Sequence, residues 1–195
     1  MEIPSLAIGE LNNIPLKGDD RRAEQWILDS IKVCKAMNVR RVLMAFFLDG
    51  DLKGDKAGTE VVIEKLKRIA PEAEKANVAL AIESFLSAEE HMYIIDRVGS
   101  NAVKIYYDVA NSQLKGYDIY KEIRMLGNNI AEFHAKDYDD IYGVGSMDFA
   151  AVRHAMDDIG YRGWLVMEGV KMPMGIEETN RYDAEYLRTI FPPVA

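Results

Sequence analysis

The feature that most constrains the fold of this chain is a sixfold alternation of short apolar runs with amphipathic segments. The runs are almost continuously apolar, which is typical of parallel strands that are covered on both faces. They lie at residues 5–9, 41–47, 78–83, 103–108, 130–135 and 164–168. Six strand–helix units in one repeating order predict an α/β fold with a parallel sheet.

Helical periodicity and capping residues predict the segments between these runs. Apolar residues at helical spacing mark helices near residues 23–37 and 62–73, and a last helix is expected over residues 176–190. A capping box that starts at Ser87 is predicted to open a third helix, and Gly99 to close it. Two more helices are expected to begin after the N-cap residues Asp118 and Asp148.

The number of units favours an incomplete barrel. A closed (β/α)8 TIM barrel needs eight strand–helix units and typically about 250 residues. This chain has 195 residues and six units. We therefore expect one domain, residues 1–195, that forms a partial TIM barrel with six parallel strand–helix units. An open doubly wound sheet is the alternative, and it would need no missing units.

Four of the apolar runs end in an ionisable residue, and this pattern favours the barrel. The residues are Glu83, Asp108, His134 and Glu168, separated by 25, 26 and 34 positions. Each interval holds one helix and its loops, so the four side chains are predicted to lie at the same end of successive strands. In a barrel these ends converge on one mouth, where barrel active sites lie.

Three carboxylates and one imidazole suit a divalent metal. Oxygen-rich ligation with a single histidine favours Mn²⁺, Mg²⁺ or Co²⁺, and Zn²⁺ is also compatible. A dication would also neutralise most of the repulsion among three clustered carboxylates. Any one of these acids, taken alone, could simply end a strand and face solvent. Four ionisable residues at the ends of successive runs instead indicate a shared site.

At these residues the sequence resembles the xylose isomerase-like barrel superfamily, within the sugar phosphate isomerase/epimerase group. The similar segments are residues 79–84, 106–111, 132–137, 143–149 and 160–168. The resemblance covers essentially the whole chain and aligns it with barrel units three to eight. It implies a metal-dependent isomerase or epimerase of a sugar or sugar phosphate that works through an enediolate intermediate.

The resemblance also implies roles for individual residues. Glu83, Asp108, His134 and Glu168 would be the metal ligands, with Mn²⁺ the favoured ion. Glu83 and Glu168 would also act as acid/base residues on opposite faces of a bound ketose. One departure concerns Asn111, which stands where many ketose epimerases of this type have a histidine, and an amide cannot transfer a proton.

Further residues are candidates for contact with the substrate. Asn12 and Asn111 follow strands and could bind substrate oxygens. Lys136 lies two residues after His134, so alternation places both on one strand face. It would pair with a phosphate or a substrate oxygen, or with Asp137 at the surface. Residues 143–145 are interpreted as a tight turn rather than a phosphate-binding loop.

Composition narrows the classes of partner. The net charge is −8 and the pI is about 5.0, which argues against nonspecific attraction to nucleic acid or to anionic membranes. The single Cys34 rules out an internal disulfide and suits a reducing compartment. Neither a signal peptide nor a membrane span is evident in the sequence, so we expect a cytoplasmic protein.

Other functions stay open at this point. A related lyase or dehydratase would begin with the same proton abstraction. An endonuclease IV-like hydrolase would need a histidine-rich zinc site, whereas the chain has three histidines. A truncated barrel could also be inactive, because its first strand would lack a neighbour. Self-association could cover that edge, so we expect a homo-oligomer that acts on a small-molecule sugar.

Overall fold

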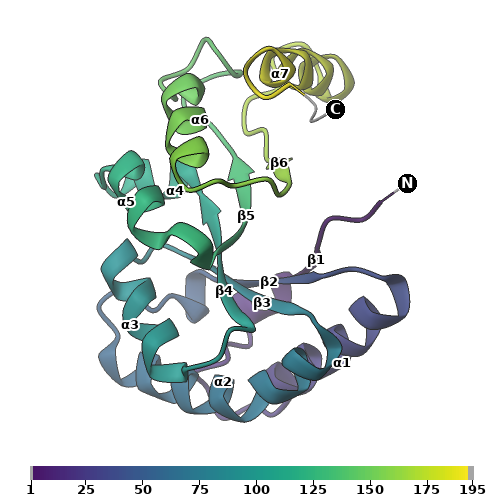
Figure 1. Cartoon of the computed structure of the whole chain (residues 1–195), viewed down its shortest axis with the longest axis vertical. Helices are drawn as coiled ribbons and strands as arrows, with labels where there is room; N and C mark the ends of the chain where they lie inside the picture. Colours follow the sequence, from purple (N-terminus) through teal and green to yellow (C-terminus); the bar gives the residue numbers. More distant parts are fainter. Residues whose placement is uncertain (1, 193–195) are drawn as a thin grey trace. The chain divides into compact units, whose positions relative to one another are not determined.

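The computed structural model describes residues 2–192 of the chain, and they group into two compact units (Figure 1). Among the described residues, unit 1 comprises 2–107 and Asn129–Ala131. Unit 2 comprises Asp108–Asn128 and residues 132–192. The expectation of one domain over residues 1–195 stays a prediction.

Unit 1 contains parallel strands in chain order. They are β1 (Leu6–Ile8), β2 (Arg41–Phe46), β3 (Ala79–Ser84) and β4 (Val103–Asp108), the last residue of which opens unit 2. Each strand pairs with the next, with Met44 opposite Ile82 and Ile82 opposite Ile105. A doubly wound sheet would reverse this order at a switch point. The unbroken order in unit 1 is that of a barrel.

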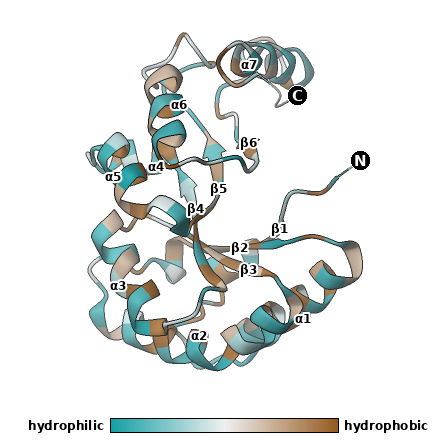
Figure 2. Ribbon diagram, in the orientation of Figure 1, coloured by the Kyte–Doolittle hydropathy of each residue, from teal (hydrophilic) through white to brown (hydrophobic). Residues whose placement is uncertain are grey.

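Helices cover this sheet because their apolar stripes match it. Helices α1 (Arg22–Met37) and α2 (Lys56–Ala76) lie against one face of β1, β2 and β3 (Figure 1), and α3 (Ala88–Val98) packs on α2. The strands between them are apolar (Figure 2), and the core contains fully buried side chains from both layers. Among these are Ile27, Val42, Met44, Ile63, Leu66, Leu80 and Ile82. Two 3₁₀ turns, Gly9–Asn12 and Leu48–Gly50, follow β1 and β2.

Unit 2 repeats the strand–helix pattern. It begins with α4 (Val109–Leu114) and α5 (Ile119–Leu126), and a 3₁₀ turn at Gly127–Asn129 leads into β5 (Ile130–Ala135). Helix α6 (Phe149–Asp158), strand β6 (Leu165–Met167) and helix α7 (Ile176–Ile190) follow. Strands β5 and β6 are parallel, with His134 opposite Val166.

The predicted elements are confirmed in type and order. Six strands occur in the described part of the chain, and each is followed by helix. Five lie inside their predicted runs, and β3 extends one residue past the predicted run 78–83, to Ser84. The capping box at Ser87 is formed with Glu90, and Asp118 and Asp148 cap α5 and α6 through their side chains. Helix α4 was not predicted. It has only six residues, and its N-cap is Asp108, which the sequence suggested only as a metal ligand.

Candidate metal centre

Three of the four predicted metal ligands lie together in unit 2. Asp108, His134 and Glu168 each offer a ligand atom, and these atoms lie within 4.8 Å of one another. Nδ1 of His134 is 3.1 Å from Oε2 of Glu168 and 3.8 Å from Oδ2 of Asp108. The Asp108 side chain is 1% exposed and that of Glu168 is 43% exposed. The cluster therefore has a buried wall and one solvent-accessible side.

Asp108 is held by the backbone of the helix that it caps. Its Oδ1 accepts hydrogen bonds from the N–H groups of Ala110 and Asn111, at 2.9 and 2.8 Å. This N-capping satisfies two donors at the start of α4. The other oxygen, Oδ2, is turned toward His134 and Lys136. The same carboxylate can thus anchor a helix and present one fixed oxygen to a cation.

Strand alternation directs His134 into this cluster. On β5, Phe133 and Ala135 are buried on the opposite strand face, where the Phe133 ring meets that of Tyr161 edge-on at 4.7 Å. The N–H of Glu168 donates to the carbonyl of Ala135 at 2.9 Å, which continues the β5–β6 pairing by one residue. That hydrogen bond places Glu168 beside the end of β5.

Lys136 is a buried member of the same cluster. Its Nζ lies 2.9 Å from Oε1 of Glu168 and 3.5 Å from Oδ2 of Asp108. Burial alone would lower the pKa of Lys136, but the neighbouring Asp108 and Glu168 carboxylates outweigh it and raise that pKa. The ammonium therefore stays charged and offsets part of the negative charge of the cluster.

The alternative pairing of Lys136 with Asp137 at the surface does not occur. Asp137 is buried, and its carboxylate accepts the N–H groups of Asp139 and Met147, each at 2.9 Å. It therefore shapes the loop between β5 and α6. Within that loop the N–H groups of Val144 and Gly145 both donate to the carbonyl of Ile141 at 3.1 Å, which supports the predicted turn over a phosphate cradle.

Asn111 is buried beside a residue that the sequence did not indicate. The hydroxyl of Tyr138 donates to Oδ1 of Asn111 at 2.5 Å, and Nζ of Lys136 lies 4.8 Å from the centre of the Tyr138 ring. Tyr138 lies on a loop, where no strand or helix period predicts which way a side chain points. A spacing of two residues from Lys136 was the only available signal.

The remaining predicted site residues belong to unit 1. Glu83 is buried and lies near the carboxyl end of β3, the strand that pairs with β4. Asn12 ends the 3₁₀ turn after β1, and its Oδ1 accepts the N–H of Phe47 at 3.0 Å. That hydrogen bond gives Asn12 a structural task, and its contact with substrate stays a prediction.

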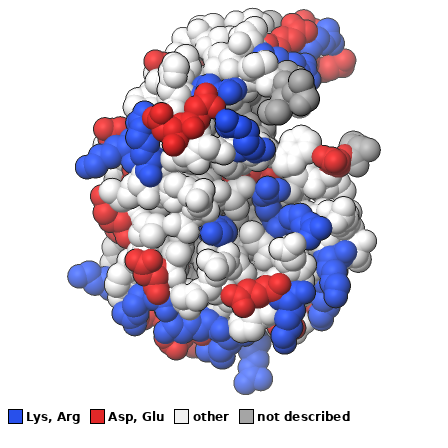
Figure 3. All heavy atoms as spheres, in the orientation of Figure 1, with Lys and Arg blue, Asp and Glu red and all other residues white. Residues whose placement is uncertain are grey.

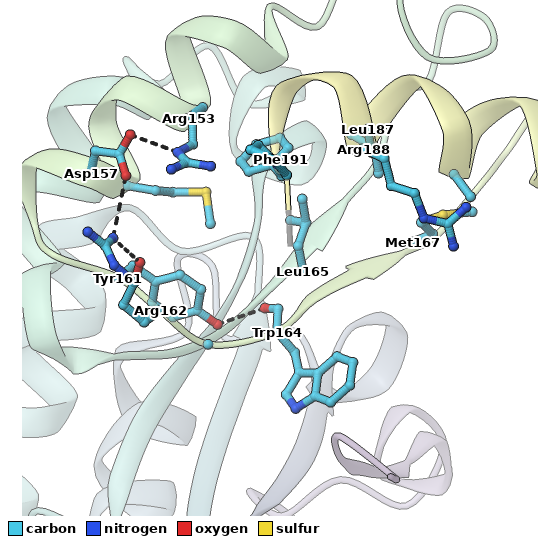
Figure 4. A pocket seen from close by; sticks show the side chains of 14 residues that line it. Arg153, Asp157, Tyr161, Arg162, Trp164, Leu165, Met167, Leu187, Arg188 and Phe191 are labelled. Atoms are coloured by element: carbon cyan, nitrogen blue, oxygen red, sulfur yellow. Dashed lines mark hydrogen bonds and ion pairs between the residues drawn. The ribbon is translucent and has the colours of Figure 1, made fainter. Parts of the chain in front are cut away.

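Unit 2 also has a groove of about 750 Å³ whose lining includes no residue of the cluster; Figure 4 shows its side chains. It is lined by Leu165 and Met167 of β6, whose side chains alternate with Val166 and Glu168, and by residues of α6 and α7 such as Leu187. Arg153 and Arg162 at its rim are paired with Asp157. The groove is therefore on the helix side of β6, opposite to the strand face that carries Glu168.

Curated relatives of this chain are sugar epimerases. A D-psicose 3-epimerase of Enterocloster bolteae is 27% identical over 139 residues, which cover 67% of this chain and 45% of that protein. A putative L-ribulose-5-phosphate 3-epimerase, SgbU, of Escherichia coli is 22% identical over 187 residues, which cover 85% of this chain and 65% of that protein. The chain thus spans less than two thirds of the length of these relatives.

Solved structures share the fold at lower identity. A D-psicose 3-epimerase crystallised with D-fructose superposes with a TM-score of 0.82 over 97% of this chain and 78% of that chain, at 17% identity. The 3-keto-D-glucoside 4-epimerase YcjR of E. coli has a TM-score of 0.83 over 97% of this chain and 80% of that chain, at 12% identity. A family model described as xylose isomerase-like TIM barrel matches residues 1–190. This chain belongs to the xylose isomerase-like TIM barrel family.

Proposed function

We propose that this chain carries the active site of a divalent-metal-dependent isomerase or epimerase of a sugar or sugar phosphate. The observation that carries the proposal is the cluster of Asp108, His134 and Glu168 in unit 2, in a family whose curated relatives here are sugar epimerases. Glu83, near the carboxyl end of β3, is the proposed fourth ligand.

The donor set fits a metal of the Mn²⁺ class. Two carboxylates and one imidazole converge, and Glu83 would add a third carboxylate, so oxygen ligands dominate. Asp108 has one oxygen fixed by backbone N–H groups, which leaves the other in a defined position for a cation. Mn²⁺ is our first choice, and Mg²⁺, Co²⁺ and Zn²⁺ are compatible with the same residues.

When bound, a divalent metal would polarise the carbonyl and the neighbouring hydroxyl of a ketose and so acidify the C–H of the hydroxyl-bearing carbon next to the carbonyl. Glu168, which is partly open to solvent, would remove or return that proton. Glu83 would carry out the complementary transfer on the other face. Return of the proton to the opposite face is epimerisation, and return to the neighbouring carbon is isomerisation.

Asn111 and Lys136 would bind substrate oxygens rather than transfer protons. An asparagine amide donates and accepts hydrogen bonds but does not titrate. A lysine ammonium has three donors and no acceptor, so Lys136 suits an accepting substrate oxygen. Proton transfer is therefore assigned to the two glutamates alone.

A hydrolase that acts on nucleic acid is disfavoured by two observations. Of the three histidines, His91 is buried in α3 and bonded to Ser84 at 2.9 Å, so it is not available to a zinc cluster. The face drawn in Figure 3 intermixes Lys and Arg with Asp and Glu and shows no continuous basic surface.

No helix among the described residues could span a membrane. A cytoplasmic location and a homo-oligomeric state remain our expectations.

The proposal is tested by incubating the purified chain with a panel of ketoses and ketose phosphates in D₂O. We expect turnover that EDTA abolishes and Mn²⁺ restores, with one deuterium incorporated at the epimerised or isomerised carbon. The matched control is Asp108→Asn, which keeps the shape of the side chain and removes its charge. Metal-dependent loss of water would instead indicate a dehydratase, and a chain that binds neither metal nor sugar would refute the proposal.

A further inference from the structure

Tyr138 contacts both side chains of unit 2 that are predicted to touch the substrate. Its hydroxyl donates to Oδ1 of Asn111 at 2.5 Å, and its ring lies 4.8 Å from Nζ of Lys136. Asn111 and Lys136 are buried, whereas Tyr138 is half-buried. Tyr138 therefore connects two groups that come from separate segments, α4 and the loop that follows β5.

The contact with Asn111 determines which end of the amide is available. The backbone N–H of Asn111 is committed to Asp108 at 2.8 Å, and the side-chain oxygen accepts the single proton of the Tyr138 hydroxyl. An amide group has one acceptor oxygen and one NH₂ with two donors. This hydrogen bond fixes the orientation of the amide, with Oδ1 held toward Tyr138 and the NH₂ directed away from it, and among the described residues no hydrogen bond to that NH₂ is found.

The contact with Lys136 restrains the ammonium. Its Nζ is held by Oε1 of Glu168 at 2.9 Å and faces the ring of Tyr138, a cation–π arrangement. A lysine side chain is otherwise flexible, and ordering it during binding costs affinity. The ring thus pre-organises the charge beside the carboxylates of Asp108 and Glu168.

We propose that Tyr138 is a positioning residue that holds Asn111 and Lys136 as a pair of hydrogen-bond donors for substrate oxygens. This inference rests on the proposed function. The ammonium only donates and the oriented amide presents its NH₂, so the oxygen atoms that the pair fits best are acceptors: a carbonyl, an enediolate oxygen or a phosphate oxygen. An accepting substrate oxygen is therefore favoured over a hydroxyl that must donate, which makes the pair a determinant of specificity.

Two substitutions separate the two contacts. Tyr138→Phe keeps the ring beside Lys136 and removes the hydrogen bond to Asn111, whereas Tyr138→Leu removes both. A single hydrogen bond of ordinary strength corresponds to about a fivefold effect. We expect Tyr138→Phe to raise KM about fivefold with kcat within about twofold, and Tyr138→Leu to lower kcat/KM further, with Mn²⁺ affinity unchanged in both. Tyr182→Phe is the matched control, because Tyr182 is an exposed residue of α7.

A double-mutant cycle distinguishes positioning from a general structural role. In the Asn111→Ala background, Tyr138→Phe is expected to have no further effect on KM, because the group it positions is gone. Additive effects of the two substitutions would overturn the inference. So would a Tyr138→Phe enzyme with the KM of the wild type.

A second readout does not depend on turnover. In ¹⁵N-labelled protein the side-chain NH₂ signals of Asn111, assigned by their loss in Asn111→Asp, are expected to shift in Tyr138→Phe and not in Tyr182→Phe. Unchanged Asn111 signals in Tyr138→Phe would overturn positioning even in an active enzyme. If the wild type neither binds nor converts any ketose or ketose phosphate, the proposed function fails, and the substrate role of Tyr138 fails with it whatever the spectra show.

Discussion

Replacement of Lys136 by methionine is expected to destabilise the metal-free protein and to strengthen its binding of a divalent metal. Methionine keeps the unbranched apolar stem and removes the ammonium. That ammonium lies 2.9 Å from Glu168 and 3.5 Å from Asp108, with the lysine side chain 10% exposed. In the metal-free protein it offsets the same carboxylates that a metal would neutralise.

The magnitude follows from the burial of the two acids. Removing one member of a fully buried ion pair typically costs 3–5 kcal/mol. Asp108 is buried, but the Glu168 side chain is 43% exposed and keeps much of its hydration. The Lys136–Glu168 pair therefore contributes little to the free energy of unfolding. We therefore expect a loss of about 2 kcal/mol in the free energy of unfolding. Removing a like charge beside the metal should tighten Mn²⁺ binding by about tenfold, equivalent to about 1.4 kcal/mol.

The assay is urea unfolding of wild type and Lys136→Met, each measured in EDTA and in excess Mn²⁺. Bound metal stabilises the folded state by mass action, so the deficit of the variant should shrink in Mn²⁺. Lys171→Met is the matched control, because Lys171 is exposed and close to Glu168 in sequence. An equal deficit in both conditions, or weaker Mn²⁺ binding by Lys136→Met, would refute the reasoning.

Three further predictions concern catalysis, acid stability and assembly. Glu168→Gln should lower kcat by about 10²–10⁴-fold, because a positioned acid/base group typically contributes a factor of that size. Sugar binding should stay measurable by calorimetry. Near wild-type rates would show that Glu168 is neither a metal ligand nor an acid/base residue. Burial lowers the pKa of His91 from 6.5 to about 4, so between these pH values the unfolded state binds more protons than the folded state. The free energy of unfolding should therefore fall as the pH drops from about 6.5 to 4, by at most about 3 kcal/mol. Denaturant midpoints across this range should vary less in His91→Gln, and an equal pH dependence would contradict the assignment. The chain should sediment as a dimer or larger species, because within unit 1 the described pairing of β1 is with β2, and within unit 2 that of β6 is with β5, which leaves each strand one edge for a partner. A stable, fully active monomer would contradict this.

The elements were predictable because local signals and packing agree in this chain. β5 begins and ends where its apolar run does, and α3 is bounded by a capping box and by Gly99 in the left-handed conformation. The position of Asp108, His134 and Glu168 at strand ends also predicted a shared site, because parallel strands present their carboxyl ends at one edge. These features depend only on neighbours in sequence and on the direction of the strands.

Contacts made by loops were beyond the reach of the sequence. Alternation placed Lys136 on the face of His134, but it could not decide between Asp137 and Glu168 as its partner. Lys136 pairs with Glu168 because the Asp137 carboxylate accepts hydrogen bonds from the N–H groups of its own loop. Tyr138 was missed for the same reason, because its hydrogen bond to Asn111 joins an irregular loop to α4.

The proposed metal centre can be tested with a crystal structure of the protein soaked with Mn²⁺, with data collected at an energy at which manganese scatters anomalously. We expect one strong anomalous peak about 2.0–2.4 Å from oxygens of Glu83, Asp108 and Glu168 and from a ring nitrogen of His134. A structure with no peak at these residues, or with Glu83 turned away from an ion held by the other three, would contradict the proposed four-ligand centre.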